Sequence, residues 1–198
     1  MSSSARLPEL WLVRHGETEW SKSGQHTGRT DIPLTDTGRI MAGRIARALA
    51  GRSFVKVLSS PLGRALDTCK LAGLGERAEI RDDLLEWNYG DYEGITTPQI
   101  RATRPTWNLW SDGCPNGEQG PDVAARVDRV IAEARAAQGD VVVFAHGHVL
   151  RVLAARWLGL GPDGGRYLAL STATVSVLGY EREQSVIHRW NDGSHLTS

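Results

Sequence analysis

Two histidines each follow a short run of apolar residues, at the point where the run ends. His15 comes one residue after the run 10–13, and His146 comes directly after the run 141–145. Short apolar runs of this kind are typical of strands that are buried on both faces. Because ligands of open α/β sheets bind beyond the carboxyl ends of the strands, the two histidines are the first candidates for a functional site.

Three charged side chains accompany these histidines. Arg14 directly precedes His15, and Arg64 lies in the first turn of a helix that Ser60-Pro61 is expected to start. Glu86 is an acid with apolar neighbours. Guanidinium groups and helix N-termini both suit a phosphate dianion. The residue types therefore predict a phosphate site that also contains a carboxyl group.

Together these five residues can hydrolyse a phosphomonoester. A neutral His15 would attack phosphorus and become a phosphohistidine, while Glu86 would protonate the departing oxygen and then deprotonate the attacking water. The equatorial oxygens of the transferred group would be held by Arg14, Arg64 and His146. The two arginines would also disfavour protonation of His15. Since fixed cations neutralise the phosphate, we expect no metal and no other cofactor.

The elements that must position these residues alternate between strand and helix. The predicted strands are residues 10–13, 54–58, 79–81, 141–145, 174–180 and 185–190; the predicted helices follow Thr35, Ser60-Pro61, Thr97-Pro98, Pro121 and His148. This alternation predicts an α/β fold with an open, largely parallel sheet covered on both faces. Residues 17–33 are expected to be a loop, and residues 96–121 an ordered excursion over the active site.

Composition limits the class of protein. The chain has 198 residues with 23 basic and 23 acidic side chains, 40% hydrophobic and 23% charged residues. These values predict one globular domain over residues 1–198, and the balanced charge argues against nucleic acid or an anionic membrane as partner. The two cysteines fit neither a disulfide framework nor a paired-cysteine zinc site. Without a membrane-length apolar stretch or a signal-peptide core at residues 1–6, we expect a cytoplasmic protein.

Four ordered segments resemble the histidine phosphatase superfamily, the phosphoglycerate-mutase-like proteins. They are Leu12-Val13-Arg14-His15-Gly16-Glu17-Thr18, then Ser59-Ser60-Pro61-Leu62-Gly63-Arg64-Ala65, then Leu85-Glu86 with Gly90 and Glu93-Gly94, and finally Ala145-His146-Gly147. The resemblance implies a three-layer α/β/α sandwich with a mostly parallel central sheet. It also implies His15 as nucleophile, Glu86 as proton donor, and a phosphate pocket of Arg14, Arg64 and His146.

The finer match is to sedoheptulose-bisphosphatase-like members and to broad-specificity acid phosphatases. It is carried by residues 20–28, 87–94, 107–114 and 144–148. The cofactor-dependent mutases usually have Asn where this chain has Ser21, and they carry a longer basic insertion after the acid/base glutamate. The family pattern implies that the substrate is lined by Glu17, Ser21, Thr27, Gly28, Tyr89, Gly147 and His148.

The resulting prediction is a metal-independent phosphatase for small phosphorylated metabolites, either a sugar phosphate or bisphosphate phosphatase or a broad acid phosphatase. Two alternatives stay open: a phosphoglycerate mutase that returns the phosphate to a glycerate, and a catalytically silent protein that binds a phosphorylated ligand. A metal site at His15, His146 and His148 is disfavoured because two arginines would repel the cation. The apolar residues of the last two strands suit either the core or a homodimer interface.

Overall fold

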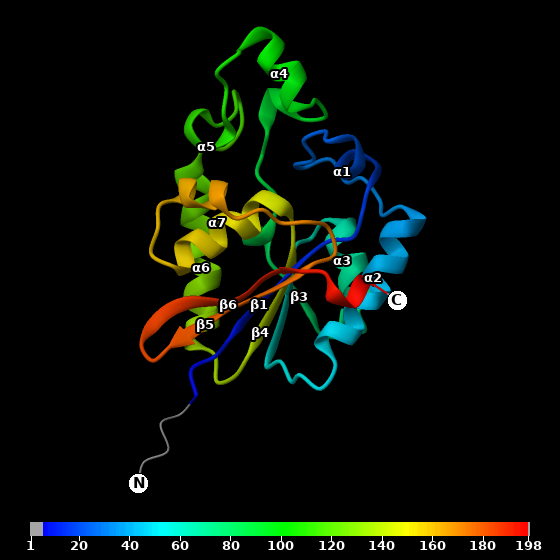
Figure 1. Cartoon of the computed structure of the whole chain (residues 1–198), viewed down its shortest axis with the longest axis vertical. Coiled ribbons are helices and arrows are strands. Elements are labelled where there is room, and N and C mark those ends of the chain that lie inside the picture. Colours follow the sequence, from blue (N-terminus) through cyan, green and yellow to red (C-terminus); the bar gives the residue numbers. More distant parts are fainter. Residues whose placement is uncertain (1–5, 198) are drawn as a thin grey trace.

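A six-stranded sheet forms the centre of the molecule (Figure 1), in a computed structural model that describes residues 6–197. The strands are β1 (Leu10–Arg14), β2 (Lys56–Ser59), β3 (Ala78–Ile80), β4 (Val141–Ala145), β5 (Val175–Glu181) and β6 (Gln184–Asp192), in the order β3-β2-β4-β1-β5-β6. Neighbours among β3, β2, β4 and β1 are parallel, whereas β5 is antiparallel to both β1 and β6. The predicted α/β class with a mostly parallel sheet is confirmed.

Helices cover both faces of this sheet. One layer contains α2 (Asp36–Leu49) and α3 (Gly63–Leu71), and the other contains α6 (Gly120–Ala136) and α7 (Gly147–Trp157). Successive side chains of a strand point to opposite faces. On β1, Leu10 and Leu12 pack with α6 and α7, while Trp11 and Val13 pack with α2 and α3. The apolar run that predicted β1 therefore serves two cores, one on each face, as the three-layer sandwich requires.

Two of the predicted helix starts have different outcomes. Thr35 caps α2 as expected, because its hydroxyl accepts the backbone N–H of Gly38 at 2.9 Å. The prediction that Ser60 caps α3 is wrong: α3 begins at Gly63, and the N-cap position has no side-chain hydrogen bond. The Ser60 N–H instead bonds to a β4 carbonyl, and its hydroxyl lies 2.8 Å from His146 Nε2. These bonds extend the strand-like path of the chain beyond β2.

Short helices lie beyond the carboxyl ends of the parallel strands (Figure 1). They are α1 (Glu19–Ser23), α4 (Thr97–Thr103) and α5 (Leu109–Asp112), and 3₁₀ turns occur at Gly75–Arg77, Asp82–Leu84, Gly90–Tyr92, Pro162–Tyr167 and Ser194–Leu196. The expected loop at residues 17–33 contains α1, which is fixed by a reciprocal capping box between Thr18 and Ser21. That the excursion at residues 96–121 covers the active site stays a prediction.

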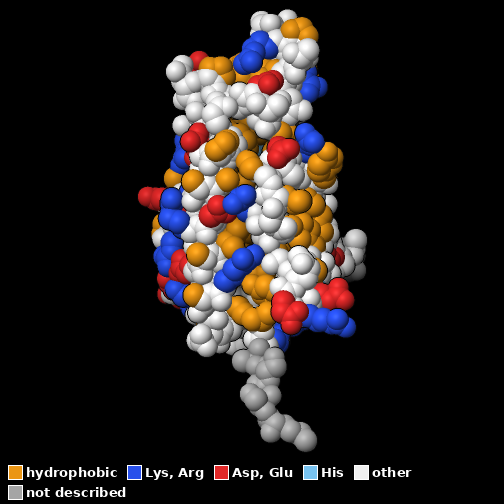
Figure 2. Space-filling model, turned by 90° about the vertical axis from the view of Figure 1, so that its left-hand side faces the viewer, with side chains coloured by type: hydrophobic (Ala, Val, Ile, Leu, Met, Phe, Trp, Pro, Cys, Tyr) orange, Lys and Arg blue, Asp and Glu red, His pale blue; other side chains and the backbone are white. Residues whose placement is uncertain are grey.

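The surface carries both signs of charge. On the face shown in Figure 2, basic and acidic side chains are interspersed among hydrophobic ones. Within residues 6–197, every helix is too short or too polar to cross a bilayer. Residues 1–5, on which the expectation about a signal peptide depends, lie outside the described residues.

Candidate active site

The two histidines that follow β1 and β4 lie side by side at the carboxyl end of the sheet. The β1–β4 pairing continues one residue past the strand, because the N–H of His15 donates to the carbonyl of Ala145 at 3.0 Å. The imidazole rings of His15 and His146 have their centroids 5.2 Å apart. A cavity of about 180 Å³ opens next to His15, and its wall is drawn from β1, the loop around α1, the segment 86–89 and α7.

His15 has the tautomer and the protonation state of a nucleophile. The side chain is 4% exposed, and its Nδ1 lies 2.7 Å from the carbonyl oxygen of Gly16. A carbonyl can only accept, so Nδ1 carries the proton and Nε2 keeps its lone pair. Burial, and then the charges of Arg14 and Arg64, hold the pKa of His15 well below its usual range. The ring is therefore neutral near pH 7.

The backbone beside His15 leaves no room for a side chain. A Cβ on Gly16 would overlap the carbonyl oxygen of Gly38, in the first turn of α2. The close approach of these two glycines brings the start of α2 against the segment that carries His15. Glycine is required at position 16 for this contact rather than for an unusual backbone angle.

Arg14 offers an unused donor to the cavity. One of its terminal nitrogens donates to the carbonyl of Leu170, while Nε is buried and has no hydrogen-bond partner in the part of the chain that the structure describes. Buried polar atoms are nearly always hydrogen-bonded, so an unpaired guanidinium N–H in a cavity wall indicates a place for an acceptor on a ligand. An oxygen of a phosphoryl group supplies such an acceptor.

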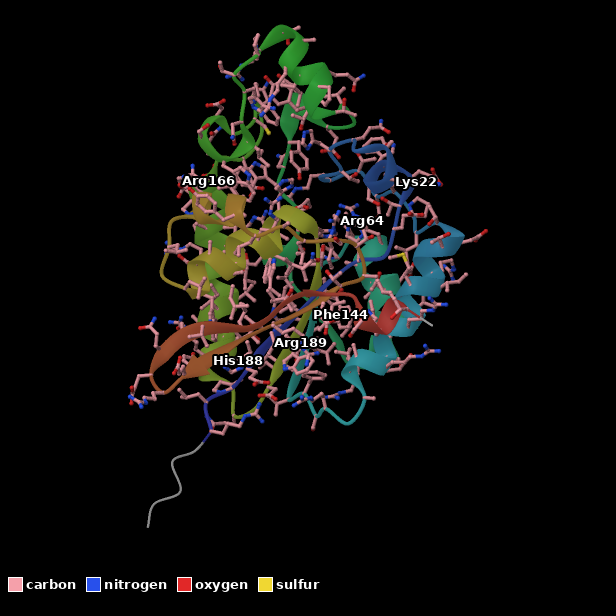
Figure 3. All side chains as sticks on the ribbon, in the orientation of Figure 1. Lys22, Arg64, Phe144, Arg166, His188 and Arg189 are labelled. Carbon is pink, nitrogen blue, oxygen red and sulfur yellow. The ribbon has the colours of Figure 1, made fainter. Side chains whose placement is uncertain are left out.

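Arg64 and His146 lie behind His15 and are bonded to each other. The Nε–H of Arg64 donates to Nδ1 of His146 at 3.1 Å, so the other ring nitrogen carries the proton and donates to Ser60. Burial and the nearby cations hold the pKa of His146 well below its usual range, and the ring is neutral. Figure 3 shows Arg64 in the interior, near the end of β4 that bears Phe144.

The remaining nitrogens of Arg64 hold the loop that follows α1. They donate to the carbonyls of Thr27, Gly28 and Thr30 at 2.8–3.2 Å. Neither Arg64 nor His146 lines the cavity. The expected phosphate pocket contained both side chains together with Arg14, and of these three Arg14 lines the cavity. Their buried charge and dipoles nevertheless act on His15 from directly behind it.

Glu86 faces the cavity and is held by backbone donors. Its Oε1 accepts the N–H groups of Trp87 and Val149 at 2.9 and 2.8 Å, and Oε2 accepts that of His148 at 3.0 Å. Two of these donors belong to the first turn of α7, so the carboxyl group also caps that helix. The arrangement fixes Glu86 in the same cavity as His15.

Tyr89 and His148 form a polar pair in the cavity wall. Burial, and then the charge of Glu86, raise the pKa of Tyr89 well above its usual range, so the phenol keeps its proton. The phenol oxygen lies 2.6 Å from Nδ1 of His148, within hydrogen-bond distance. Burial also holds the pKa of His148 well below its usual range, so that ring is neutral near pH 7.

The predicted residues divide into two groups. Those that line the cavity are Arg14, His15, Ser21, Thr27, Glu86, Tyr89, Gly147 and His148. Those that do not line it are Arg64, His146, Glu17 and Gly28. The Glu17 carboxylate accepts the hydroxyl of Thr35 at 2.8 Å, and Gly28 bonds to Glu93 through its N–H and to Arg64 through its carbonyl. The assignment of these residues as catalytic or substrate-binding stays a prediction.

Sequence reasoning missed Arg151 in the cavity wall. Its guanidinium lies over the ring of Trp110 at 4.6 Å, its Nε donates to the carbonyl of Gly165 at 3.1 Å, and among residues 6–197 it forms no ion pair within 4 Å. Arg151 follows Gly147 by four residues on α7, so the two residues lie on the same face of the helix. That spacing was the signal that could have found it.

Metal-ligating side chains are not concentrated at this site. Across residues 6–197, no group of three or more His, Cys, Asp and Glu side chains is placed to hold an ion. Both cysteines are buried, and burial raises the pKa of each thiol to about 12. They therefore stay protonated near pH 7.

Comparisons with known proteins identify the family of the chain. Relatives include an acid phosphatase of Mycobacterium tuberculosis, 45% identical over 181 residues that cover 89% of this chain and 88% of the relative. The sedoheptulose 1,7-bisphosphatase of Saccharomyces cerevisiae is 40% identical over 186 residues, with 78% and 69% covered. A solved structure of an open reading frame from Mycobacterium tuberculosis superposes with a TM-score of 0.86 at 40% identity, covering 93% of this chain and 97% of the other.

The family model described as histidine phosphatase superfamily (branch 1) matches residues 10–193, which include both strand-end histidines, Arg64 and Glu86. The chain belongs to the histidine phosphatase superfamily, branch 1, and is a phosphoric monoester hydrolase.

Proposed function

We propose that the cavity next to His15 hydrolyses small phosphomonoesters through a phosphohistidine, without a metal ion. The observation that carries the proposal is the state of His15: a buried, neutral imidazole whose Nδ1–H is fixed by Gly16 and whose Nε2 has no hydrogen-bond partner among residues 6–197. The unpaired Nε–H of Arg14 lies in the same wall. A nucleophile and a donor for a phosphoryl oxygen thus meet in one cavity.

In the first step, Nε2 of His15 forms a bond to phosphorus as the ester P–O bond breaks. The departing oxygen takes a proton from the carboxyl group of Glu86, and the leaving group exits as an alcohol. Negative charge on the transferred group is stabilised by Arg14 in contact and by Arg64 from behind His15. Because Nδ1 keeps its proton, the phosphorylated ring of His15 carries a positive charge, which the carbonyl oxygen of Gly16 stabilises.

In the second step, water replaces the histidine. The Glu86 carboxylate takes a proton from the water as its oxygen bonds to phosphorus, and the P–N bond breaks to return a neutral His15 and inorganic phosphate. Glu86 ends protonated, ready for the next ester. Because the three backbone bonds hold Glu86 in one place, the same carboxyl group can serve both steps.

The substrate class that we propose is a phosphorylated sugar or sugar bisphosphate. Arg151 supports it, because its half-buried guanidinium has no acidic partner among residues 6–197 and can donate to an oxygen of the sugar in the leaving group. The similarity to a sedoheptulose 1,7-bisphosphatase supports it as well. The similarity to an acid phosphatase supports a wider range of phosphomonoesters around that preference.

The experiment measures phosphate release with EDTA present. The panel contains sedoheptulose 1,7-bisphosphate, fructose 1,6-bisphosphate, 3-phosphoglycerate and p-nitrophenyl phosphate, with His15→Ala as the control. We expect EDTA-resistant release by the wild type, with the bisphosphates preferred, and none above background by the variant. Acid-labile labelling of the wild type by ³²P substrate would identify the phosphohistidine.

Two results would contradict the proposal. Release that EDTA abolishes would place a metal ion in the reaction. Absence of release from every ester, together with conversion of 3-phosphoglycerate to 2-phosphoglycerate when the bisphosphate is supplied, would identify a mutase instead.

A further inference from the structure

A second cavity adjoins the first. It has a volume of about 220 Å³ and is built mainly from residues 97–110 of the excursion. His26 and His148 line both cavities and form their shared boundary, with ring centroids 6.4 Å apart. Reaction chemistry at His15 makes no use of this second space.

Aromatic rings form much of the second wall. Trp107 is buried, and its ring meets His26 edge-on with the centroids 5.6 Å apart. Trp110 is half-buried, and its ring lies 5.4 Å from that of His148. Because Trp107 is buried, Trp110 is the tryptophan of this wall that offers an apolar surface to the carbon–hydrogen face of a sugar or polyol.

The charge in this cavity is positive and uncompensated. None of its lining residues is acidic, and Arg101 is its cation. The Nε–H of Arg101 donates to the carbonyl of Trp107 at 2.9 Å, and within the described part of the chain its terminal nitrogens form neither an ion pair nor a hydrogen bond. Asn108 adds a side-chain amide whose oxygen accepts the N–H of Trp110 at 3.0 Å. Among residues 6–197 the amide nitrogen of Asn108 has no acceptor, so it can donate to a ligand.

We propose that this second cavity is a subsite for the far end of the leaving group, in which Arg101 binds a second acidic group, phosphate or carboxylate. The carbohydrate part of the substrate would lie against Trp110, between Arg101 and the ester at His15. The inference rests on the proposed function, because the leaving group must first be placed by the phosphoryl site.

The imidazoles at the boundary are neutral, so the attraction of an anion to the second cavity depends on the charge of Arg101. Burial lowers the pKa of both His26 and His148, so neither contributes a positive charge near pH 7. An anion in the second cavity therefore meets one guanidinium whose position is already fixed through its Nε–H. Substitution of Arg101 should therefore reduce the preference for substrates with a second acidic group over substrates without one.

The experiment compares two substrates that share the same reacting phosphate. Fructose 1,6-bisphosphate and fructose 1-phosphate differ only in the distal phosphate, and analysis of the product identifies which ester is cleaved. The quantity measured is the ratio of their kcat/KM values in wild type, Arg101→Gln, Arg101→Lys and Arg104→Gln. Arg104 is the matched control, because it lies three residues further along, lines neither cavity and contacts Tyr92.

We expect Arg101→Gln to lower this ratio roughly tenfold, the loss of about one charge-assisted hydrogen bond. Arg101→Lys should keep most of the ratio, because it retains the charge, and Arg104→Gln should leave the ratio unchanged. An unchanged ratio in Arg101→Gln overturns the subsite. An equal fall in the Gln and Lys variants also overturns it, because the Nε–H bond to Trp107 would then be what matters.

A third substrate separates failure of the subsite from failure of the proposed function. p-Nitrophenyl phosphate has no second acidic group, so its hydrolysis by wild type and not by His15→Ala tests the phosphoryl chemistry alone. If no ester is hydrolysed, the proposed function fails and the subsite is judged by calorimetric binding of fructose 1,6-bisphosphate. Binding roughly tenfold weaker to Arg101→Gln than to wild type would then support the subsite, and equal binding would overturn it.

Discussion

Replacing Glu86 by glutamine tests whether one carboxyl group both moves protons and caps a helix. In the wild type its two oxygens accept three backbone N–H groups, of Trp87, His148 and Val149. A glutamine has one oxygen, which can keep at most two of these bonds. Its amide NH₂ must then face the remaining N–H, donor against donor, in a side chain that is 4% exposed.

The structural cost of this change can be worked out. Leaving one buried N–H without an acceptor costs about 2 kcal/mol of the free energy of unfolding. For a chain of this length, each kcal/mol lowers Tm by about 2–4 °C, so we expect Glu86→Gln to unfold about 4–8 °C below the wild type. Asp91→Asn is the matched control, since Asp91 is exposed and, within residues 6–197, its carboxylate hydrogen-bonds only to the side chain of Asn116. That change should alter stability by less than about 0.5 kcal/mol.

The catalytic cost depends on the leaving group. Loss of a general acid should lower kcat/KM for a sugar phosphate by about 10²–10⁴. The loss should be much smaller for p-nitrophenyl phosphate, because nitrophenolate leaves without a proton. Attack by water still lacks its base, so stopped-flow absorbance should show a burst of about one equivalent of nitrophenolate, then slow turnover.

Equal losses of kcat/KM on both substrates, with no burst, would refute the assignment of Glu86 as the proton donor. Unchanged Tm would refute the capping argument independently. Circular dichroism and differential scanning calorimetry give the stability, and stopped-flow kinetics give the chemistry.

Three further changes follow from the structure. Gly16→Ala forces a methyl group against the Gly38 carbonyl and should cost about 1–3 kcal/mol, seen as a lower urea midpoint; an unchanged midpoint would show that α2 can move aside. Three buried histidines, His15, His146 and His148, have pKa values in the folded state below the value near 6.5 of the unfolded chain. In acid the unfolded chain therefore binds more protons than the folded chain. The free energy of unfolding should be retained above pH 6.5 and should fall below it, by up to about 4 kcal/mol per pH unit for the three groups together. Urea midpoints that stay constant from pH 7.5 to 5 would contradict this. Arg126→Met removes two hydrogen bonds of 2.8 and 3.1 Å from the Glu118 carboxylate, which keeps the Asn88 N–H and the more distant Arg29, and should cost about 1–3 kcal/mol by calorimetry; a Tm equal to wild type would contradict it.

Strand-end residues were the part of the site that could be predicted from the sequence. An apolar run that stops at a polar residue marks the end of a buried strand, and the parallel sheet then brings such ends together. His15 and His146 meet for this reason, although 130 residues separate them. The four parallel strands were predicted from apolar runs in the same way, and the longer helices were predicted from apolar residues that recur at helical spacing.

Features that depend on the path of a loop were not predictable. The role of Ser60 was mistaken because its hydroxyl has two uses, as a helix cap or as a partner of His146, and only the tertiary structure decides between them. Arg64 bonds to carbonyls of residues 27–30, and backbone carbonyls carry no sequence signal. The short helix α1 was missed because its five residues bury no side chain and so show no apolar periodicity.

The separation of the two cavities has an evolutionary consequence. The first cavity is lined from the end of β1, the loop around α1, residues 86–89 and α7, whereas the second cavity comes mainly from the excursion, with His26 and His148 as the shared boundary. An insertion, deletion or substitution between residues 96 and 121 can therefore reshape the far wall while β1 and β4 keep their register. Substrate specificity can therefore evolve through mutations in a single surface segment, while the residues of the first cavity stay unchanged.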